Sequence, residues 1–271
     1  MDNFEKLYYE QSEFWSKDFQ EDPAERERIE EITRIIPSDV HNILDVGCGN
    51  GVFINTLPHK YKVTGLDFSK EALKYVKRDK ILGEITNLPF EKESFDLVTC
   101  LEVLEHLSSD DFKKGALELQ WISKKYIIIT VPNKEASEYS SVMCPVCHCR
   151  FNPNLHQRSF NERILHRLFA NFKLVKIKKI GPVNETFCWN WLLFTFYSRW
   201  IRSIPPKYSI CPWCGYQSKE KDYSRIHKRK EITQNSFQRK VFSSLKSLGK
   251  RVWPTKKEER WLLALYKKSN G

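Results

Sequence analysis

The chain has 271 residues, of which 41% are apolar and 13% aromatic, and its formal net charge is +11. This length and apolar content suffice for a large hydrophobic core and exclude an intrinsically disordered protein. Residues 1–180 hold 26 Lys and Arg against 28 Asp and Glu, so the basic excess lies in the last third. That excess predicts an acidic partner, such as phosphate, nucleic acid or anionic lipid, or a solvated basic face.

The first residues, MDNFEKLYYEQ, are acidic and polar and lack the basic start and the apolar stretch of a secretory signal. We therefore expect a cytoplasmic protein. The longest apolar run, at 187–201, is interrupted by Asn190, Ser198 and Arg199 and is too short to span a bilayer. In a reducing compartment, eight cysteines with two Cys-x-x-Cys pairs favour a metal site over disulfides.

Strands and amphipathic helices alternate along the first two thirds of the chain. We predict strands at 42–46, 62–67, 81–85, 95–101, 126–131 and 173–180. Helices are predicted at 23–36, 51–57, 69–78, 110–123 and 161–171. The last of these should start at a capping box formed by Ser159 and Glu162. Such alternation predicts parallel pairing and right-handed crossovers, and hence an α/β fold with a doubly wound sheet.

The first predicted strand runs into the sequence ILDVGCGNG. Gly47, Gly49 and Gly51 form a turn whose missing side chains let a ligand lie against the backbone at the carboxyl edge of the sheet. A dinucleotide fingerprint would need a third glycine at Val52 instead. The second strand ends in VTGLDFS, which places Asp67 at the same edge, where its carboxylate can accept both hydroxyls of a ribose.

Four ordered motifs cover residues 40–180: ILDVGCGNG, VTGLDFS, GEITNLPFEKESFDLVTCLEVLEHL and YIIITVPN. In these motifs the chain resembles the class I S-adenosylmethionine-dependent methyltransferases, and within them the type 11 group. The resemblance implies a Rossmann-like, mostly parallel seven-stranded sheet and S-adenosylmethionine as the methyl donor.

The resemblance also implies a set of cofactor contacts. The methionine end of the cofactor would be held by Asp45, Gly47, Cys48, Gly49 and Gly51, and the ribose by Asp67. Phe68 would lie on the adenine, Glu84 and Ile85 would contact its edge, and Leu101 and Glu102 would close the pocket. The family usually has Asp at the position of Glu84. Tyr8, Tyr9 and Trp15 in the aromatic lead-in would form a lid or simply pack.

Methyl transfer from a sulfonium is an in-line displacement, so the protein mainly holds donor and acceptor at attack distance. A base is needed only when the acceptor must lose a proton. His106, in VLEHL, and His156, in NLHQRSF, both follow strands at the active-site edge. We predict His156 as a base or a ligand of the acceptor, with a structural role as the alternative, and His106 as a second candidate that could merely brace its turn.

Two Cys-x-x-Cys pairs, CPVCHC and CPWCG, have the spacing of zinc knuckles. Cys144, Cys147, Cys211 and Cys214 would complete a tetrahedral four-thiolate site. Because such a site has no open coordination position, we predict a structural zinc ion. The first knuckle, within 144–149, has His148 in place of glycine and an additional Cys149. The sequence therefore does not decide which atoms of this knuckle bind the metal.

The segment ERWLLALYKK predicts a last strand at 261–267. Class I methyltransferases end in an antiparallel strand beside the sixth, so the resemblance divides the chain into a methyltransferase domain, 1–181 and 259–271, and a basic insertion, 182–258. Within the insertion, 237–253 has apolar residues at helical spacing opposite lysines and arginines. This pattern predicts either peripheral contact with an anionic membrane or a helix packed on the sheet.

Three functions remain open. The first is methylation of a small-molecule or glycan acceptor, including a lipid-linked one at the inner face of the membrane. The second is RNA methylation, in which the basic insertion and the zinc module would bind the phosphate groups of the RNA. The third is a non-catalytic binding protein. The absence of an Asn-Pro-Pro-Tyr motif disfavours RNA, and the intact glycines and Asp67 disfavour the third.

Overall fold

The computed structural model describes residues 3–15, 22–135, 141–187, 209–218 and 255–269. These belong to two compact units. The first, the sheet unit, comprises 1–136, 156–182 and 259–271, and the second, the cysteine unit, comprises 137–155 and 183–258.

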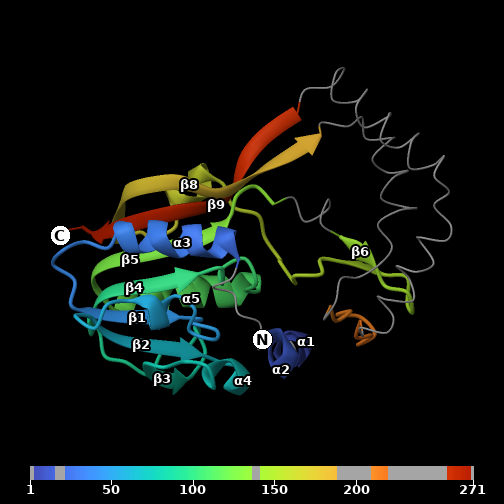
Figure 1. Ribbon diagram of the computed structural model, residues 1–271, viewed down its shortest axis with the longest axis horizontal. Coiled ribbons are helices and arrows are strands. Elements are labelled where there is room, and N and C mark those ends of the chain that lie inside the picture. Colours follow the sequence, from blue (N-terminus) through green and yellow to red (C-terminus); the bar gives the residue numbers. More distant parts are fainter. Residues whose placement is uncertain (1–2, 16–21, 136–140, 188–208, 219–254, 270–271) are drawn as a thin grey trace. The chain divides into compact units, whose positions relative to one another are not determined.

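A seven-stranded sheet with the order β3-β2-β1-β4-β5-β9-β8 forms the core of the sheet unit (Figure 1). Its strands are β1 (Asn42–Val46), β2 (Lys62–Asp67), β3 (Asp79–Leu82), β4 (Phe95–Leu101), β5 (Ser123–Pro132), β8 (Phe172–Phe187) and β9 (Thr255–Lys268). The pairs β1–β2, β1–β4, β2–β3 and β4–β5 are parallel, and β9 is antiparallel to β5. The predicted mostly parallel, doubly wound sheet is thus confirmed.

The central strands are apolar on both faces because both faces are covered. Ile43 of β1 packs in one buried cluster with Ile29 and Ile32 of α3 (Pro23–Arg34). Its neighbour Leu44 points to the other face and joins a cluster that contains Leu119 of α5 (Ser109–Ile122). Successive residues of a strand point to opposite faces, so one apolar run serves two cores.

The predicted last strand lies within β9. It inserts beside β5 with Leu265 opposite Ile128 and Leu263 opposite Thr130. All residues from Trp261 to Tyr266 are buried, as the apolar block in the sequence predicts.

Both long helices begin at a side chain that caps their first turn. Asp22 accepts a hydrogen bond from the amide of Ala24 at the start of α3, and Ser108 accepts one from the amide of Asp111 at the start of α5. Each cap satisfies one of the free amide groups of a first helical turn. The N-terminal segment forms two further short helices, α1 (Asn3–Tyr9) and α2 (Ser12–Trp15).

The helices that follow β1 and β2 are shorter than the predicted 51–57 and 69–78. After β1 there is one 3₁₀ turn, η2 (Ile54–Thr56), and after β2 there is α4 (Lys70–Leu73), capped by Ser69. The side chain of Asn55 accepts a hydrogen bond from the amide of Lys77 and donates one to the carbonyl of Tyr75. These bonds replace helical ones, so the chain after α4 runs as a connection into β3.

The predicted capping box before 161–171 is wrong. The helix is α6 (Glu162–Leu165), and its N-cap is Asn161, whose side chain accepts from the amide of Ile164. Asn is as good an N-cap as Ser, and here it lies next to the helix start. Ser159 lies two residues too early.

The described part of the cysteine unit is small. It contains a two-stranded ribbon, β6 (Val142–Met143) and β7 (Arg150–Phe151), and an isolated bridge between Ile210 and Gln217. The predicted amphipathic segment 237–253 and most of the apolar run 187–201 lie outside the described residues. Among the helices that are described, none has the length and apolar character needed to cross a membrane.

Candidate functional site

The glycine turn leaves β1 in a backbone conformation that glycine adopts readily. Gly47, Gly49 and Gly51 have φ angles of 75°, 54° and 76°. A side chain at Gly47 would collide with Val103, and a Cβ at Gly49 would lie 2.9 Å from Cζ3 of Trp15. The sequence therefore needs glycine here for both conformation and space.

Asp67 ends β2 beside this turn. Its carboxylate accepts hydrogen bonds from the amides of Gly49 and Ser69, each at 2.8 Å. Burial raises the pKa of Asp67 to about 6, although the amide bonds act in the opposite direction. The two amides fix the carboxylate and still leave oxygen lone pairs for the hydroxyls of a ribose.

Asp45 lies in the strand before the turn and is buried. The hydroxyl of Thr99 donates to its Oδ1 at 2.6 Å. Burial raises the pKa of Asp45 to about 7; the Thr99 bond and the Arg28 charge oppose this rise, and the charge of Asp67 adds to it. The thiol of Cys48 is also buried, and burial raises its pKa, so it is unsuited to act as a thiolate.

The aromatic N-terminal segment lies against the same edge. The carbonyl of Tyr9 accepts hydrogen bonds from the hydroxyl of Ser69 at 2.8 Å and from Nε1 of Trp15 at 2.5 Å. The ring of Tyr9 meets that of Phe68 edge to face at 5.6 Å. The carboxylate of Glu10 accepts from the first amides of α4. These contacts hold the N-terminal aromatic segment against the glycine turn, at the position predicted for the lid.

The remaining predicted contacts are more dispersed. Glu84 pairs with Asn87 in a short bridge, and Ile85 is buried in the core cluster that contains Leu66. Leu101 is the last residue of β4, and Glu102 follows it with a φ angle of 55°. The carboxylate of Glu102 lies 3.7 Å from Arg28.

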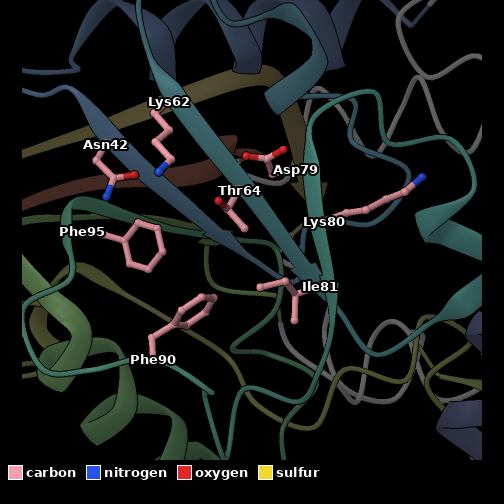
Figure 2. Close-up of a pocket in the computed structure, with 8 residues that line it drawn as sticks. All are labelled: Asn42, Lys62, Thr64, Asp79, Lys80, Ile81, Phe90 and Phe95. Atoms are coloured by element: carbon pink, nitrogen blue, oxygen red, sulfur yellow. The ribbon is translucent and has the colours of Figure 1, made fainter.

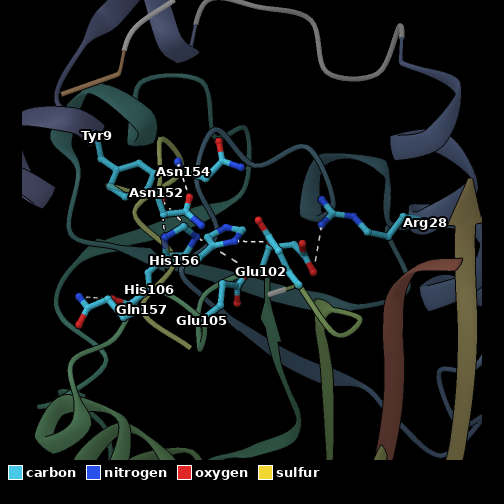
Figure 3. A network of polar contacts seen from close by, with 10 residues as sticks. Tyr9, Arg28, Glu102, Glu105, His106, Asn152, Asn154, His156 and Gln157 are labelled. Carbon is cyan, nitrogen blue, oxygen red and sulfur yellow. Dashed lines mark hydrogen bonds and ion pairs between the residues drawn. The ribbon is translucent and has the colours of Figure 1, made fainter. Parts of the chain in front are cut away.

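A second group of polar side chains comes from the segments that follow β4 and β7. We call Glu105, His106 and His156 the histidine–carboxylate cluster (Figure 3). The two imidazole rings meet at 4.7 Å, and Nδ1 of His156 lies 2.6 Å from the carboxylate of Glu135. The hydroxyl of Tyr9 lies 3.2 Å from Nδ1 of His106. One tyrosine therefore joins the cluster to the edge that carries the glycine turn.

Glu105 is the buried acid of this cluster. Its exposed fraction is 0%, and within the described part of the chain its carboxylate oxygens accept no hydrogen bond. Burial, together with the nearby charge of Glu102, raises the pKa of Glu105 well above its usual value. Sequence reasoning missed both Glu105 and Glu135. The three-residue spacing of Glu102 and Glu105 beside His106 could have drawn attention to the first of them.

The four predicted cysteines form one group in the cysteine unit. Sγ of Cys144 lies 3.5 Å from that of Cys214, and Sγ of Cys147 lies 3.6 Å from that of Cys211. A disulfide would need about 2.05 Å. Four thiolates around zinc at about 2.3 Å are about 3.8 Å apart, so the sulfur positions suit a tetrahedral zinc site.

The two knuckles have the same backbone despite their different sequences. His148 has a φ angle of 59° and donates its amide to the carbonyl of Cys144, while Gly215, with a φ angle of 71°, donates to Cys211. The extra Cys149 contributes its backbone carbonyl, which accepts from the amide of Cys144, and is not among the grouped cysteines.

A surface cavity of about 410 Å³ lies elsewhere, at the opposite edge of the sheet (Figure 2). Its lining includes Asn42, Lys62 and Asp79, which are the first residues of β1, β2 and β3. In open parallel sheets, ligands bind outside the carboxyl ends of the strands. We therefore place the chemistry at the glycine turn, which the N-terminal aromatic rings cover, and not in this cavity.

Comparisons with known proteins agree with this geometry. Residues 44–124, which contain the glycine turn, Asp67 and most of the histidine–carboxylate cluster, match the family described as methyltransferase domain. No curated protein matches the chain.

Solved structures share the fold. A chain from the complex between the Haloferax volcanii Trm112 methyltransferase activator and a methyltransferase is 14% identical, with a TM-score of 0.55 over 100% of this chain and 99% of that one. A methyltransferase from Bacillus halodurans is 13% identical, with a TM-score of 0.52 over 89% of this chain and 99% of that one. From the family match and the fold together, the chain carries a class I, S-adenosylmethionine-dependent methyltransferase domain.

Proposed function

We propose that the enzyme methylates a hydroxyl group on a small-molecule or glycan acceptor. The acceptor oxygen would lie against the histidine–carboxylate cluster, next to the sulfonium of a cofactor held by the glycine turn, Asp45 and Asp67. Phe68 would cover the adenine, and the lead-in with Tyr9 and Trp15 would close over the cofactor.

The observation that carries this proposal is the position of His156. Its Nδ1 is bonded to the carboxylate of Glu135, so in the neutral ring the proton resides on that nitrogen and Nε2 carries the lone pair. A nitrogen base oriented by a carboxylate is the arrangement used to remove protons from weak acids such as hydroxyls. Its neighbour His106 is linked through Tyr9 to the cofactor edge.

The reaction balances without another reactant. A lone pair of the acceptor oxygen attacks the methyl carbon, and the carbon–sulfur bond breaks with its electron pair remaining on sulfur. The hydroxyl proton passes to a basic group of the cluster. The products are a methyl ether and S-adenosylhomocysteine, and the protein contributes position and proton removal.

The test is transfer of a deuterated methyl group. Wild-type enzyme and an Asp67→Ala variant would be incubated with labelled S-adenosylmethionine and fractionated cell extract. We expect label in a small-molecule or lipid-linked glycan fraction, on oxygen, and only with wild type. Label in RNA or protein instead, or on nitrogen or carbon, would contradict the proposal.

We also propose that the four cysteines hold one structural zinc ion. Their sulfur–sulfur distances suit a tetrahedral site, and a closed four-thiolate site leaves no position for substrate. In this role the ion would clip together two segments of the cysteine unit that are more than 60 residues apart in the sequence.

Membrane contact through 237–253 stays a prediction, because those residues lie outside the described part of the chain. Binding to anionic vesicles should weaken with added salt and weaken further in a Val241→Asp, Leu245→Asp double variant. If RNA is the partner, Lys246, Lys250 and Arg251 should control the salt dependence instead.

A further inference from the structure

We propose that Glu105, His106 and His156 bind a divalent transition-metal cation, separate from the zinc of the cysteine unit. One ligand atom from each residue lies within 4.8 Å of the other two. A point therefore exists within about 2.8 Å of all three atoms. Bonds of about 2.0–2.2 Å need shifts of under about 1 Å, which side-chain rotation can supply.

The orientation of His156 supports a ligand role. Histidines that bind metal usually donate their other ring N–H to a carboxylate, which fixes the ring and raises the basicity of the free nitrogen. Nδ1 of His156 has such a partner in Glu135, at 2.6 Å. Nε2 is then the nitrogen left for a cation.

The buried carboxylate of Glu105 supplies an independent argument. It is fully buried, and no hydrogen bond within the described residues satisfies either of its oxygens. A buried polar group without a partner is costly and calls for a ligand or an ion. Nε2 of His106 lies 3.9 Å from its Oε1 and, when neutral, cannot compensate a negative charge.

The donor set indicates the class of cation. Two imidazoles and one carboxylate suit manganese, iron, cobalt or zinc better than calcium or magnesium, which prefer oxygen ligands alone. Glu102 already lies 3.7 Å from Arg28, so we leave it outside the ligand set.

The role of the cation, but not the site itself, rests on the proposed function. A bound cation would hold the acceptor oxygen and lower the pKa of its hydroxyl. In that state Nε2 of His156 is a ligand instead of the base, its bond to Glu135 orients it, and the proton of the acidified hydroxyl passes to solvent water.

Manganese distinguishes this site from the cysteines, because Mn²⁺ is hard and binds thiolates weakly. The full-length protein, loaded with only one equivalent of zinc per chain so that the four thiolates take it, would be titrated with MnCl₂, with bound metal followed by the loss of the electron paramagnetic resonance signal of free Mn²⁺. We expect about one Mn²⁺ per chain. Glu105→Gln and His156→Ala should each weaken its binding at least tenfold, and Glu135→Gln by about 10- to 100-fold.

Two controls separate metal binding from folding. His166→Ala, at an exposed histidine, and Cys211→Ser should bind Mn²⁺ like wild type. S-adenosylhomocysteine binding by each variant reports a folded cofactor site. Should Glu105→Gln fail to fold, His156→Ala decides.

Absence of Mn²⁺ binding, or unchanged affinity in a variant that still binds S-adenosylhomocysteine, would overturn the site. Methyl transfer to hydroxyls without Mn²⁺ binding would leave the proposed function intact. Mn²⁺ binding without such transfer would refute only the function.

Discussion

The cysteine cluster and the histidine–carboxylate cluster are built in opposite ways. The first combines two copies of one local turn, in which His148 and Gly215 take the same left-handed position. The second combines side chains that follow two different strands, with Glu105 and His156 about 50 residues apart. In the first, sulfurs lie close to other sulfurs. In the second, a buried carboxylate has no hydrogen bond within the described chain.

This difference separates a site that holds the fold from a site that can do chemistry. Four thiolates that held one zinc ion, as proposed, would leave no coordination position open, so the cysteine cluster would then only stabilise the fold. The histidine–carboxylate cluster lies one tyrosine away from the cofactor edge, and within the described residues the carboxylate of Glu105 accepts no hydrogen bond. Unsatisfied buried groups of this kind mark functional sites more often than structural ones.

Removing a cysteine ligand is expected to have the largest effect on stability. Cys211→Ser should lower bound zinc from about one equivalent per chain to nearly none and lower Tm by about 5–10 °C, because structural metal binding contributes folding free energy. Turnover of the remaining folded enzyme should change less. Elemental analysis and thermal unfolding provide the measurement.

Cys149→Ser is the matched control, because among the described residues Cys149 contributes its backbone carbonyl and its thiol is not part of the cysteine group. A wild-type protein that is stable and free of zinc would show that the cysteine cluster is not a structural zinc site.

Removing the oriented histidine should affect catalysis instead. His156→Ala is expected to lower the rate of methyl transfer by about 10²- to 10⁴-fold, the usual contribution of acid–base or ligand groups. Its Tm and its affinity for S-adenosylhomocysteine should stay near those of wild type. His166→Ala should leave all three quantities unchanged. A variant that loses stability but keeps its rate would show that His156 is structural.

The pH dependence of cofactor binding sharpens the assignment of the acids. Burial raises the pKa of Asp67 to about 6 and that of Asp45 to about 7, and Arg28 and Glu10 are the other charges that act on them. Ribose hydroxyls donate to an ionised carboxylate, so affinity for S-adenosylhomocysteine should fall as pH drops through about 7 to 6.

The stability of the ligand-free protein should instead increase as the pH drops. Because both folded pKa values exceed the unfolded value of about 3.9, these acids contribute most to stability below that pH. Their contribution is lost as pH rises through 6 to 7. Calorimetry would measure the affinity for S-adenosylhomocysteine, and denaturant unfolding the free energy of unfolding, between pH 5 and 8. In Asp67→Asn, the change of each quantity near pH 6 should disappear.

The smallest effect is expected at the glycine turn. Gly49→Ala would put a Cβ at a φ angle of 54° and 2.9 Å from Trp15, costing about 1–3 kcal/mol. In a Trp15→Ala background, Gly49→Ala should cost only the strain of placing alanine at this positive φ angle, because the contact with the Trp15 ring is gone. Gly83→Ala meets only the flexible end of Leu66 and is the control. Equal costs in both backgrounds would mean that Trp15 does not lie on the turn in solution.

The sequence predicts well whatever depends on local pattern. β1, β2 and β4 have the predicted ends, because short, mostly apolar segments between turns mark buried parallel strands. The cysteine group follows from spacing alone. The placement of Asp67 at the glycine turn follows from the rule that carboxyl ends of parallel strands share one edge.

What depends on tertiary contacts was missed. The side chain of Asn55 reaches across to residues 75 and 77, and no helix propensity could foresee that α4 would end so early. The N-cap was misplaced by two residues because Ser159 and Asn161 are equally good caps. Glu135 showed no signal, because its role arises only where the segment after β5 brings it to His156.

Titration of S-adenosylhomocysteine into the purified protein would show whether the cofactor binds at the glycine turn. We expect measurable binding by wild type, a loss of about 100-fold or more in Asp67→Ala, and unchanged binding in Asp79→Ala, where the acid lies at the opposite edge. Loss of two charge-assisted hydrogen bonds is the physical reason. Equal binding by wild type and Asp67→Ala would contradict the placement of the cofactor at the glycine turn.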